Sequence, residues 1–447
     1  MNTLQAGFSR VNITPMLGIG IAGYYKIRKA DGVLDELEIN ALAVACGEDK
    51  ALLISVDHCG MTKEIINPMR QSIVDVTGLP WESIYIHSTH THTGPYMREN
   101  TTDPLEIEYI QTVHHKMVDA ARMALDDLKP AKMGYGVGDA PNIAFVRRFR
   151  MKDGSVRTNP GVDNPEIDCP IGDVDERVNV LRFDREGAES ICLVNFGNHP
   201  DVVGGNKISA DWPGFTRRTV EKVLDNTLCI FFNGAQGDVN HVNVHPRGGY
   251  LNDMFMDFDD VARGYKHSQY LGRVVTGGVL QAWDKVKYVD VDKISCAEKF
   301  MEVPANLPDP AELPEAHRIN DLHNAGKDSE LPYTGMMLTT VVARAARMVR
   351  LENGPDSFRM PLSGLAIGPV AFVGIPGEPF TGVGRGIKEA EGWGLVLPTC
   401  NTNAKEGYFP MLECYEQGGY EAGSSKFKAG VAELIIEEGK AMLEGLK

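Results

Sequence analysis

Positive charge is scarce in this chain of 447 residues, which has 45 Lys and Arg against 61 Asp and Glu, a formal net charge of −16. A nucleic-acid-binding protein normally presents a basic face, so this balance disfavours nucleic acid as a partner. It also disfavours electrostatic docking on an anionic membrane. No stretch approaches the ~18 consecutive apolar residues of a membrane-spanning helix. We therefore expect no stable membrane insertion.

Cysteine pairs are missing as well. The eight cysteines are scattered without any C-x-x-C spacing, which argues against a cysteine-rich zinc site or a disulfide framework. Cys192 and Cys229 lie in apolar runs, as buried free thiols do. The first 15 residues show no basic start followed by an apolar run, so no secretory signal is predicted. These absences together predict a cytoplasmic protein.

Nucleotide-binding motifs are incomplete. Gly18-Ile19-Gly20 lacks the third glycine and the following helix of a dinucleotide fold. The Gly-rich loop from Asn233 to Asn240 does not end in the Gly-Lys-Ser/Thr of a phosphate-binding loop. Neither segment supports a nucleotide cofactor.

What the chain does contain is 43% hydrophobic residues, arranged as short apolar runs that alternate with helical patterns. Strands are predicted at 41–45, 51–56, 83–87, 193–196 and 229–232, and helices at 63–76 and 107–128. Such alternation is typical of an α/β sandwich, and we expect mixed sheets with flanking helices.

Residues 1–447 are predicted to form a single domain with one insertion. Residues 303–350 are Pro-marked and charged at first and helical at the end, which makes them hard to place in a sheet. We interpret them as a peripheral excursion or lid. A contact between copies in a homo-oligomer is the alternative role.

Histidines are concentrated in His87-Ser88-Thr89-His90-Thr91-His92, directly after an apolar strand. If the strand geometry continues, His90 and His92 share one face and His87 takes the other. Two imidazoles at a strand end suit a zinc ion. Taken alone, however, the motif is more often one structural histidine with two exposed ones.

Two further segments place a metal-ligand type at a strand end. Asn195-Phe196-Gly197-Asn198-His199-Pro200 presents a single histidine, and Gly374-Ile375-Pro376-Gly377-Glu378-Pro379 presents a carboxylate. The alternatives are a turn histidine at a surface corner and a glutamate that complements the dipole of the next helix. A carboxylate at the end of a buried strand is costly unless it is paired or metal-bound.

A Gly-rich loop and a tyrosine-bearing loop complete the candidates. Backbone N–H groups near Gly237 suit an oxyanion, and Asp238 is a candidate for orienting a ligand or accepting a proton. The alternative for Asp238 is a turn residue that caps its own loop. Tyr408 and Tyr415 follow in the C-terminal part, where loop aromatics most often simply pack on the surface.

These segments, taken together and in order, resemble the catalytic N-terminal domain of the neutral/alkaline non-lysosomal ceramidase family. The likeness begins at Gly7-Phe8-Ser9-Arg10-Val11-Asn12-Ile13-Thr14-Pro15 and extends to about Ser425. It is carried by Thr89–Pro95, Asn195–Pro200, Pro376–Glu378 and Gly407-Tyr408. The joint occurrence of all four in one chain is specific, although each one alone is weak.

The resemblance implies one zinc ion, held by His90, His199, Glu378 and Tyr408, with Tyr415 as the alternative to Tyr408. It further implies that His92 contacts the carbonyl oxygen under attack. Arg147 or Arg148 is similar to the arginine on the substrate side of the family's site, with solvated arginines of an edge strand as the alternative.

Two departures from the family pattern change the expected chemistry. Asn240 stands where the family's loop carries a serine often assigned as the nucleophile, and an amide cannot form an acyl-enzyme. The family's members also carry a C-terminal immunoglobulin-like domain and usually a secretion signal, and we expect neither here. A metal-activated water must then attack directly.

The sequence thus predicts a zinc-dependent hydrolase that cleaves an amide, or a related C–N or ester bond, in a small polar molecule. An arginine pair beside zinc suggests a substrate with a carboxylate, a phosphate or dense hydroxyls. One alternative is a true ceramidase acting on N-acyl sphingoid lipids. The others are a lactonase or phosphoesterase on the same zinc, and an inactive metal-containing binding protein.

Overall fold

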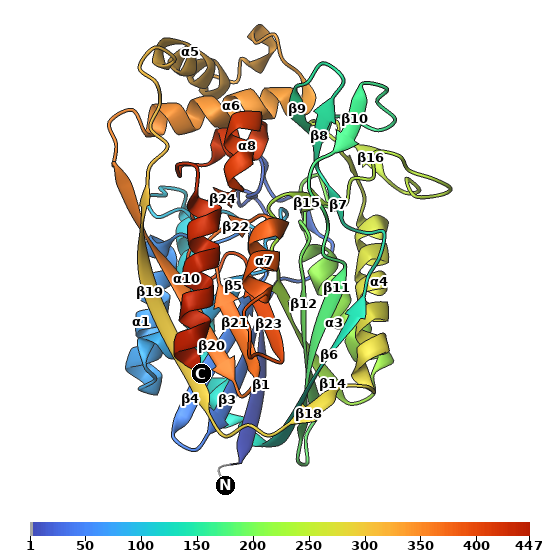
Figure 1. The fold of residues 1–447 in the computed structure, drawn as a ribbon, viewed down its shortest axis with the longest axis vertical. Coiled ribbons are helices and arrows are strands. Elements are labelled where there is room, and N and C mark those ends of the chain that lie inside the picture. Colours follow the sequence, from blue (N-terminus) through green and yellow to red (C-terminus); the bar gives the residue numbers. More distant parts are fainter. Residues whose placement is uncertain (1–2) are drawn as a thin grey trace.

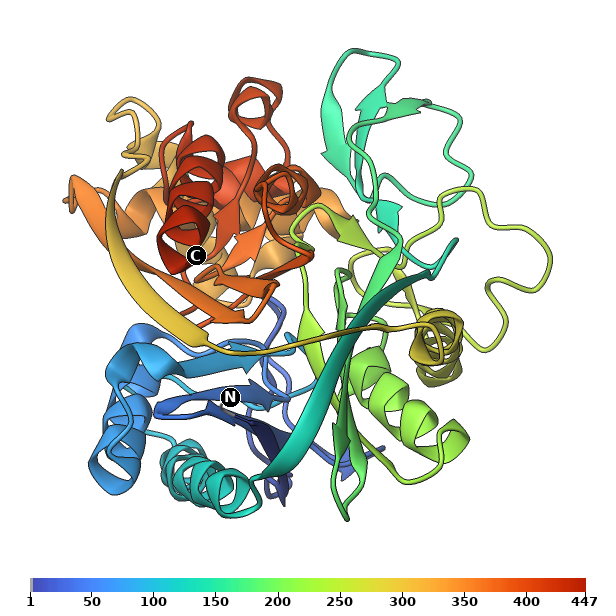
Figure 2. The ribbon, with the colours of Figure 1, turned by 60° about the horizontal axis from the view of Figure 1, so that its bottom comes forward.

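Two β-sheets pack face to face, and helices cover the outer face of each, as the computed structural model of residues 3–447 shows (Figures 1 and 2). The larger, nine-stranded sheet has the order β14 (Thr227–Asn233), β12 (Ser190–Phe196), β11 (Arg177–Arg185), β6 (Lys129–Asp139), β1 (Leu4–Asn12), β3 (Glu38–Cys46), β4 (Asp49–Val56) and β5 (Ile84–Ser88), with β18 (Lys287–Val289) paired to β6. The smaller sheet has the order β19 (Ile294–Pro304), β20 (Ser357–Ile367), β21 (Val370–Gly374) and β23 (Leu395–Thr399).

The alternation of side chains along the strands builds the layers. In β3, Leu42 and Val44 belong to the core between the two sheets, together with Phe372 of β21. Ala41 and Ala43 face the other way, toward the helices. Successive strand residues point to opposite faces, so one apolar run supplies two separate cores.

Helices close both outer faces. On the larger sheet lie α1 (Lys63–Thr77), α2 (Pro104–Asp126), α3 (Asp211–Val223) and α4 (Tyr265–Trp283). On the smaller sheet lie α7 (Thr381–Lys388) and α10 (Val431–Leu446). The resulting sandwich confirms the predicted fold class of mixed sheets with flanking helices.

Parallel pairing brings several strand ends to one edge of the sandwich. The strands β4 and β5 are parallel neighbours, as are β12 and β14, and β21 and β23. Short pairs lie beyond that edge: β7 (Phe145–Val146) with β15 (Val239–Asn240), and β22 (Glu378–Pro379) with β24 (Tyr408–Phe409). The loops that follow parallel strands therefore converge on one place.

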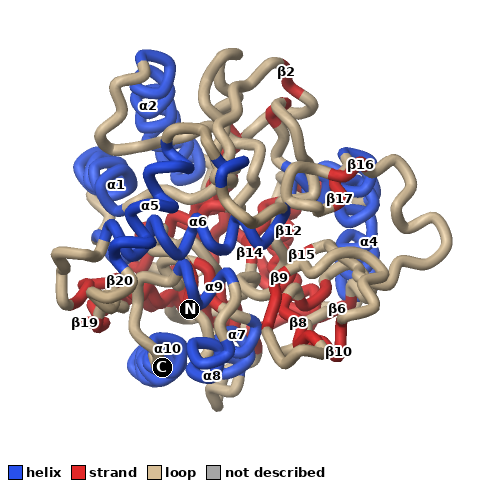
Figure 3. The backbone as a smooth tube through the Cα atoms, turned by 90° about the horizontal axis from the view of Figure 1, so that it is seen from above, coloured by secondary structure: helices blue, strands red, loops and turns tan. Residues whose placement is uncertain are grey.

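The excursion between β19 and β20 lies across this same end of the molecule (Figure 3). It contains α5 (Leu313–Asn324), a short 3₁₀ turn (Asp328–Glu330) and α6 (Gly335–Arg350), which share a small apolar core of their own around Ile319 and Met348. Val303 and Pro304 pair with Phe358 and Ser357 in the sheet, so the excursion begins after Pro304. Its role as a lid stays a prediction.

The remaining elements are small. The strands β8 (Arg148–Met151), β9 (Val156–Thr158) and β10 (Ile167–Pro170) form a three-stranded sheet, and β2 (Gly32–Val33) pairs with β13 (Lys207–Ile208). The strands β16 (Phe255–Met256) and β17 (Ala262–Arg263), the 3₁₀ turn Trp81–Ser83, and helices α8 (Leu412–Gln417) and α9 (Tyr420–Ser424) complete the list. No helix within residues 3–447 is long and apolar enough to cross a membrane.

Candidate metal centre

His90 and His92 meet just beyond the end of β5. The strand ends at Ser88, and His90 has a backbone φ of 77°, a left-handed conformation that is rare for residues with a side chain. Although the strand does not continue, Nε2 of His92 lies 3.2 Å from Nε2 of His90. The predicted proximity of the two rings is thus present, and the kink at His90 produces it rather than strand alternation.

The other nitrogen of His90 fixes the ring. Nδ1 donates to the backbone carbonyl of Cys59 at 2.7 Å. The Nδ1 atom of His199, which follows β12, likewise donates to the carbonyl of Gln236 at 2.8 Å. Both imidazoles are fully buried, and this hydrogen bonding leaves each Nε2 with a free lone pair. Carbonyl-anchored Nδ1–H groups are the usual arrangement of metal-binding histidines.

Glu378 and Tyr408 reach the same point because β22 and β24 pair in register. Oε2 of Glu378 lies 3.2 Å from Nε2 of His90 and 3.3 Å from Nε2 of His199. The phenol oxygen of Tyr408 lies 3.5 Å from Nε2 of His199. These separations match the edges of a small tetrahedron with ligand distances near 2.0–2.2 Å, roughly 3.3–3.6 Å.

The donor set fits a metal cation. Oε2 of Glu378 is buried and has no hydrogen-bond partner within the described part of the chain. Ligand atoms of His90, His199 and Glu378 all lie within 4.8 Å of one another. Two imidazoles, one carboxylate and a phenol are borderline donors that suit zinc. A cation at this point would bind the unpartnered carboxylate oxygen and the two free imidazole lone pairs that face it.

Without a metal, a proton takes the place of the cation. Burial is the largest single influence on His90 and favours its neutral form, but the Glu378 carboxylate and the Cys59 thiol together outweigh it and raise the pKa of His90 to about 10. The same attraction holds the pKa of Glu378 well below its ordinary value despite burial. Burial lowers the pKa of His92 well below the usual range, and the pKa of His199 is also lowered by burial and by Arg147. His92 is therefore a neutral imidazole at pH 7.

Arg147 lies against this cluster, whereas Arg148 does not. The Arg147 guanidinium donates to Glu421 at 2.7 Å and to the carbonyl of Gly237 at 2.7 Å, and its third nitrogen lies 3.4 Å from Nε2 of His199. The Arg148 guanidinium contacts Cys414 at 2.8 Å and the carbonyl of Gly418 at 3.0 Å. Hydrogen bonds to protein groups thus use most of the guanidinium N–H groups of both arginines.

The Gly-rich loop with Asp238 and Asn240 is held by hydrogen bonds to neighbouring segments. Asp238 accepts hydrogen bonds from the backbone and hydroxyl of Thr381 at 2.7 and 2.9 Å, and so holds the start of α7. The amide of Asn240 donates to Asn159 at 3.1 Å and accepts from the backbone of Val242 at 3.0 Å. Burial raises the pKa of Asp238. Both side chains are engaged by protein groups in this state.

Gly237 lets that loop approach β22. A Cβ at this position would lie 2.5 Å from the backbone oxygen of Glu378. The Gly237 N–H donates to the carbonyl of Pro379 at 2.8 Å, so it is not free for an oxyanion. The glycine is needed for close backbone contact, and its N–H is used by the protein.

A cavity of about 630 Å³ opens above the cluster, and its walls contain residues that the sequence analysis missed. His90, His92, Glu378 and Tyr408 lie at one side, and Cys59, Lys405, Tyr24 and Tyr420 add to the lining. The thiol of Cys59 lies 3.4 Å from Nζ of Lys405, which helps lower its pKa to about 7 although burial opposes this. Cys59 follows β4, the parallel neighbour of β5, and this position is the sequence signal that could have placed it beside His90.

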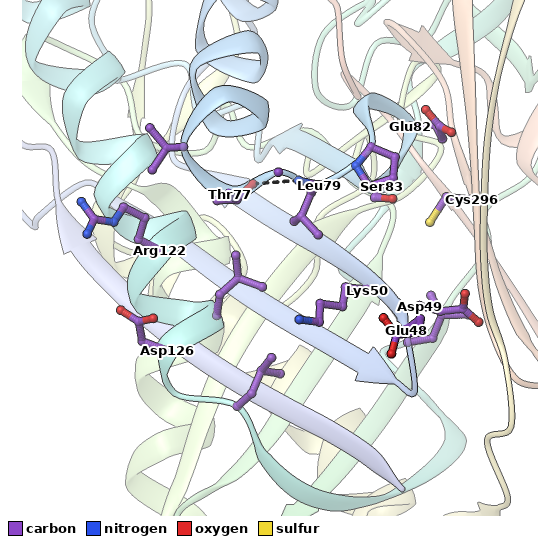
Figure 4. A pocket seen from close by; sticks show the side chains of 16 residues that line it. Glu48, Asp49, Lys50, Thr77, Leu79, Glu82, Ser83, Arg122, Asp126 and Cys296 are labelled. Carbon is purple, nitrogen blue, oxygen red and sulfur yellow. Dashed lines mark hydrogen bonds between the residues drawn. The ribbon is translucent and has the colours of Figure 1, made fainter. Parts of the chain in front are cut away.

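A second cavity of about 680 Å³ lies at the other end of β4 (Figure 4). It is lined by Glu48, Asp49, Lys50, Arg122 and Asp126, among others. Since Lys50 and Cys59 are separated by most of that strand at ~3.3 Å per residue, the two cavities are distinct. Although carboxylates line the second cavity, none of its lining residues belongs to a cluster that could hold a metal ion among the described residues, so we assign no chemistry to it.

The fold and the cluster define a class: a four-layer α/β/β/α sandwich with a cluster of two histidines and a glutamate at converging strand ends. Among solved structures, the chain is similar to the neutral ceramidase from Pseudomonas aeruginosa, with a TM-score of 0.73 at 16% sequence identity. The match covers 100% of this chain and 75% of that one. A structure described as ceramidase complexed with C2 matches with the same TM-score and identity and is covered to 76%.

No protein-family model and no curated protein matches the chain. At 16% identity the structural likeness establishes the fold. The resemblance to neutral ceramidase inferred from four short motifs is therefore confirmed at the level of the fold.

Proposed function

We propose that this protein is a zinc-dependent hydrolase that cleaves an amide bond by direct attack of water. The observation that carries the proposal is the convergence of Nε2 of His90, Nε2 of His199 and Oε2 of Glu378. The ceramidase fold supports the amide as the bond class. Tyr408, rather than Tyr415, completes the set, since the Tyr415 hydroxyl contacts Ser425 at 3.2 Å instead.

When bound, the zinc ion supplies a Lewis acid that polarises a carbonyl oxygen and lowers the pKa of water. The residues of the chain do the rest. His92 is neutral and buried, and its Nδ1 has no hydrogen-bond partner among the described residues. Because His92 lines the cavity beside His90, we propose that its ring hydrogen-bonds the carbonyl oxygen of the substrate. The nearby Arg147 cation favours negative charge developing on that oxygen.

A covalent route through Asn240 is not available, because an amide is not a nucleophile and this one is already hydrogen-bonded. The overall reaction consumes one water and releases a carboxylate and an amine. The same Asn240 favours, as a second candidate, a protein that binds its ligand at the metal centre without turnover.

The test combines metal analysis with a substrate panel. We expect purified protein to hold one zinc per chain, and His199→Ala to lose it. His114→Ala is the control, since His114 lies on α2 and bonds Ser72. Hydrolysis of small amides should stop on chelation and return with zinc. Zinc retained by His199→Ala at full stoichiometry, or turnover that ignores the chelator, would overturn the proposal.

The other arms of the panel separate the alternatives. Ceramide, lactones and phosphoesters are offered at the same zinc loading. Preferential turnover of ceramide identifies a true ceramidase. Preferential turnover of a lactone or a phosphoester identifies a lactonase or a phosphoesterase in place of an amide hydrolase. Stoichiometric zinc with no turnover on any arm identifies the binding protein.

A further inference from the structure

Cations outnumber anions around the cavity above the metal centre, although the chain as a whole carries a net charge of −16. The cavity lining contains five cationic and three anionic side chains: Lys63, Arg98, Arg350, Lys405 and Lys426 against Glu64, Glu378 and Glu406. In a chain this acidic, a concentration of positive charge at one cavity is not explained by composition.

Three of these cations lack a carboxylate partner. Arg98 pairs with Glu106, and Lys426 pairs with Glu406. Lys63, Arg350 and Lys405 form no ion pair within residues 3–447. Like charges around one cavity repel each other, and the field they create is available to an incoming anion.

Lys405 brings its charge closest to the metal centre. Its amino group lies 3.4 Å from the thiol of Cys59, which in turn lies 4.0 Å from Nδ1 of His90. Its aliphatic part packs over Gly60, where a Cβ would come within 2.5 Å of Cδ of Lys405. Gly60 has a φ of 125°, so the backbone as well as the space favours glycine. Packing of the aliphatic part thus holds Lys405 in place, with its amino group at the cavity wall.

The other two unpaired cations come from opposite walls. Arg350 is the last residue of α6 and is supplied by the excursion. Lys63 is the first residue of α1, a helix of 15 residues whose N-terminal residues Thr62 and Lys63 line the cavity. The buried hydroxyl oxygen of Thr62 has no hydrogen-bond partner among the described residues. The positive end of the helix dipole adds to the same field.

The arginine pair of the sequence analysis does not supply this recognition. Arg147 is bound to Glu421 and Gly237, and Arg148 to Cys414 and Gly418. Neither can offer a free two-pronged contact to a substrate oxyanion. Lys63, Arg350 and Lys405 can attract an oxyanion because none of them pairs with a carboxylate within residues 3–447, and Arg350 alone among them has the guanidinium that can bind it with two hydrogen bonds.

We propose that the substrate is an amide bearing an oxyanion, a carboxylate or a phosphate, which Lys405, Arg350 and Lys63 bind while the amide lies at the His90–Glu378 cluster. This inference rests on the proposed hydrolase function and adds its substrate class. The excursion then takes part in substrate binding through Arg350.

Matched substrate pairs test the inference. N-hexanoylglycine is compared with N-hexanoylglycinamide, and N-hexanoyl-phosphoethanolamine with N-hexanoylethanolamine, with released hexanoate as the readout. We expect at least one anionic member to exceed its neutral partner by ~10-fold or more in kcat/KM, and the ratio to fall as salt is raised. The pair with the larger ratio distinguishes carboxylate from phosphate.

Charge-removing variants locate the effect. Arg350→Gln and Lys405→Met should each raise KM for the preferred anion by ~10-fold, as expected for loss of about 1.4 kcal/mol, and should raise KM for the neutral partner by clearly less. Lys152→Gln removes an exposed charge outside the cavity lining and should change neither. A ratio near one in the wild type, or equal losses for charged and neutral partners, would overturn the inference.

Binding to chelator-treated protein keeps the inference separate from the proposed function. Calorimetry with the same four compounds should show tighter binding of the anions, weakened in Arg350→Gln. If the anions bind but no amide is cleaved with zinc present, the hydrolase proposal fails and the anion site stands. If neutral amides are cleaved and the anions have no advantage in binding or turnover, the anion site fails and the hydrolase stands.

Discussion

The phenol oxygen of Tyr408 lies 3.5 Å from Nε2 of His199, and the two rings stack with centroids 6.4 Å apart. Tyr415, seven residues later, makes its hydrogen bond to Ser425 and is not part of the cavity lining. Pairing of β22 with β24 sets Tyr408 directly opposite Glu378, and nothing comparable positions Tyr415.

A comparison of two phenylalanine variants checks this relationship. Tyr408→Phe should weaken zinc binding by ~10-fold or more, since groups that contact a metal centre typically contribute 10–100-fold. Tyr415→Phe should leave zinc affinity unchanged. Competition with a zinc-chelating dye measures both. Equal affinity of the two variants would remove Tyr408 from the centre.

Glu421 should be important for stability. Its carboxylate is fully buried and accepts from Arg147 at 2.7 Å and from Thr158 at 2.9 Å. Glu421→Ala leaves the buried Arg147 without its counter-charge, a change that typically costs about 3–5 kcal/mol. Urea unfolding measures it. Glu416→Ala, an exposed site without an ion pair in the described residues, should stay within about 0.5 kcal/mol of wild type.

If Arg147 is responsible for that loss, removing it as well should restore part of the stability. The double variant Arg147→Met/Glu421→Met removes the isolated charge of Arg147; Arg148, whose Nε lies 3.9 Å from Glu421, still loses its carboxylate, so the recovery should be partial. A double variant that is as unstable as the sum of two single changes would show that packing, and not charge, accounts for the loss.

Gly237→Ala should damage the metal centre without touching a ligand. The added methyl group would lie 2.5 Å from the backbone oxygen of Glu378, so β22 must move. We expect a loss of about 1–3 kcal/mol in unfolding free energy, and weaker zinc binding. Gly277→Ala is the matched control: it lies in α4 with open space around its Cβ and should stabilise by about 0.5–1 kcal/mol. Unchanged zinc affinity in Gly237→Ala would contradict the prediction.

His87 predicts an acid-sensitive step in stability. Its Nδ1 donates to the carbonyl of Cys400 at 2.7 Å and its Nε2 accepts from the backbone of Asn233 at 2.9 Å, so the ring is satisfied only when neutral. Burial lowers its pKa to about 3. Because the folded-state pKa lies below the unfolded value near 6.5, its contribution is present above pH 6.5 and declines as pH falls toward 3, by on the order of 4 kcal/mol.

Urea unfolding between pH 7 and pH 4 measures that decline. His87→Gln supplies a donor and an acceptor without titrating, so its stability should fall less steeply with acid than that of the wild type. The difference between the two curves isolates His87 from the other buried histidines. Parallel curves would show that His87 does not carry the effect.

The sequence by itself predicted several of the elements and the candidate metal-ligand residues. The period of an apolar run, two for a strand and 3.6 for a helix, reflects which side chains are buried locally. Periodicity therefore located the strands near 41–45, 51–56 and 229–232 and the helix at 63–76. Histidine and glutamate at strand ends, with glycine and proline after them, marked His90, His199 and Glu378 because parallel strands place such ends together.

Tertiary structure decided what lies between those elements. Glu421 and Lys405 are an ordinary acid and an ordinary base in the sequence; their partners, Arg147 and Cys59, are 274 and 346 positions away. The commitment of Arg148 to Cys414 and Gly418 likewise depends on long-range packing. Which charge is neutralised and which stays free for a ligand is fixed by contacts between distant segments, and no local pattern encodes that choice.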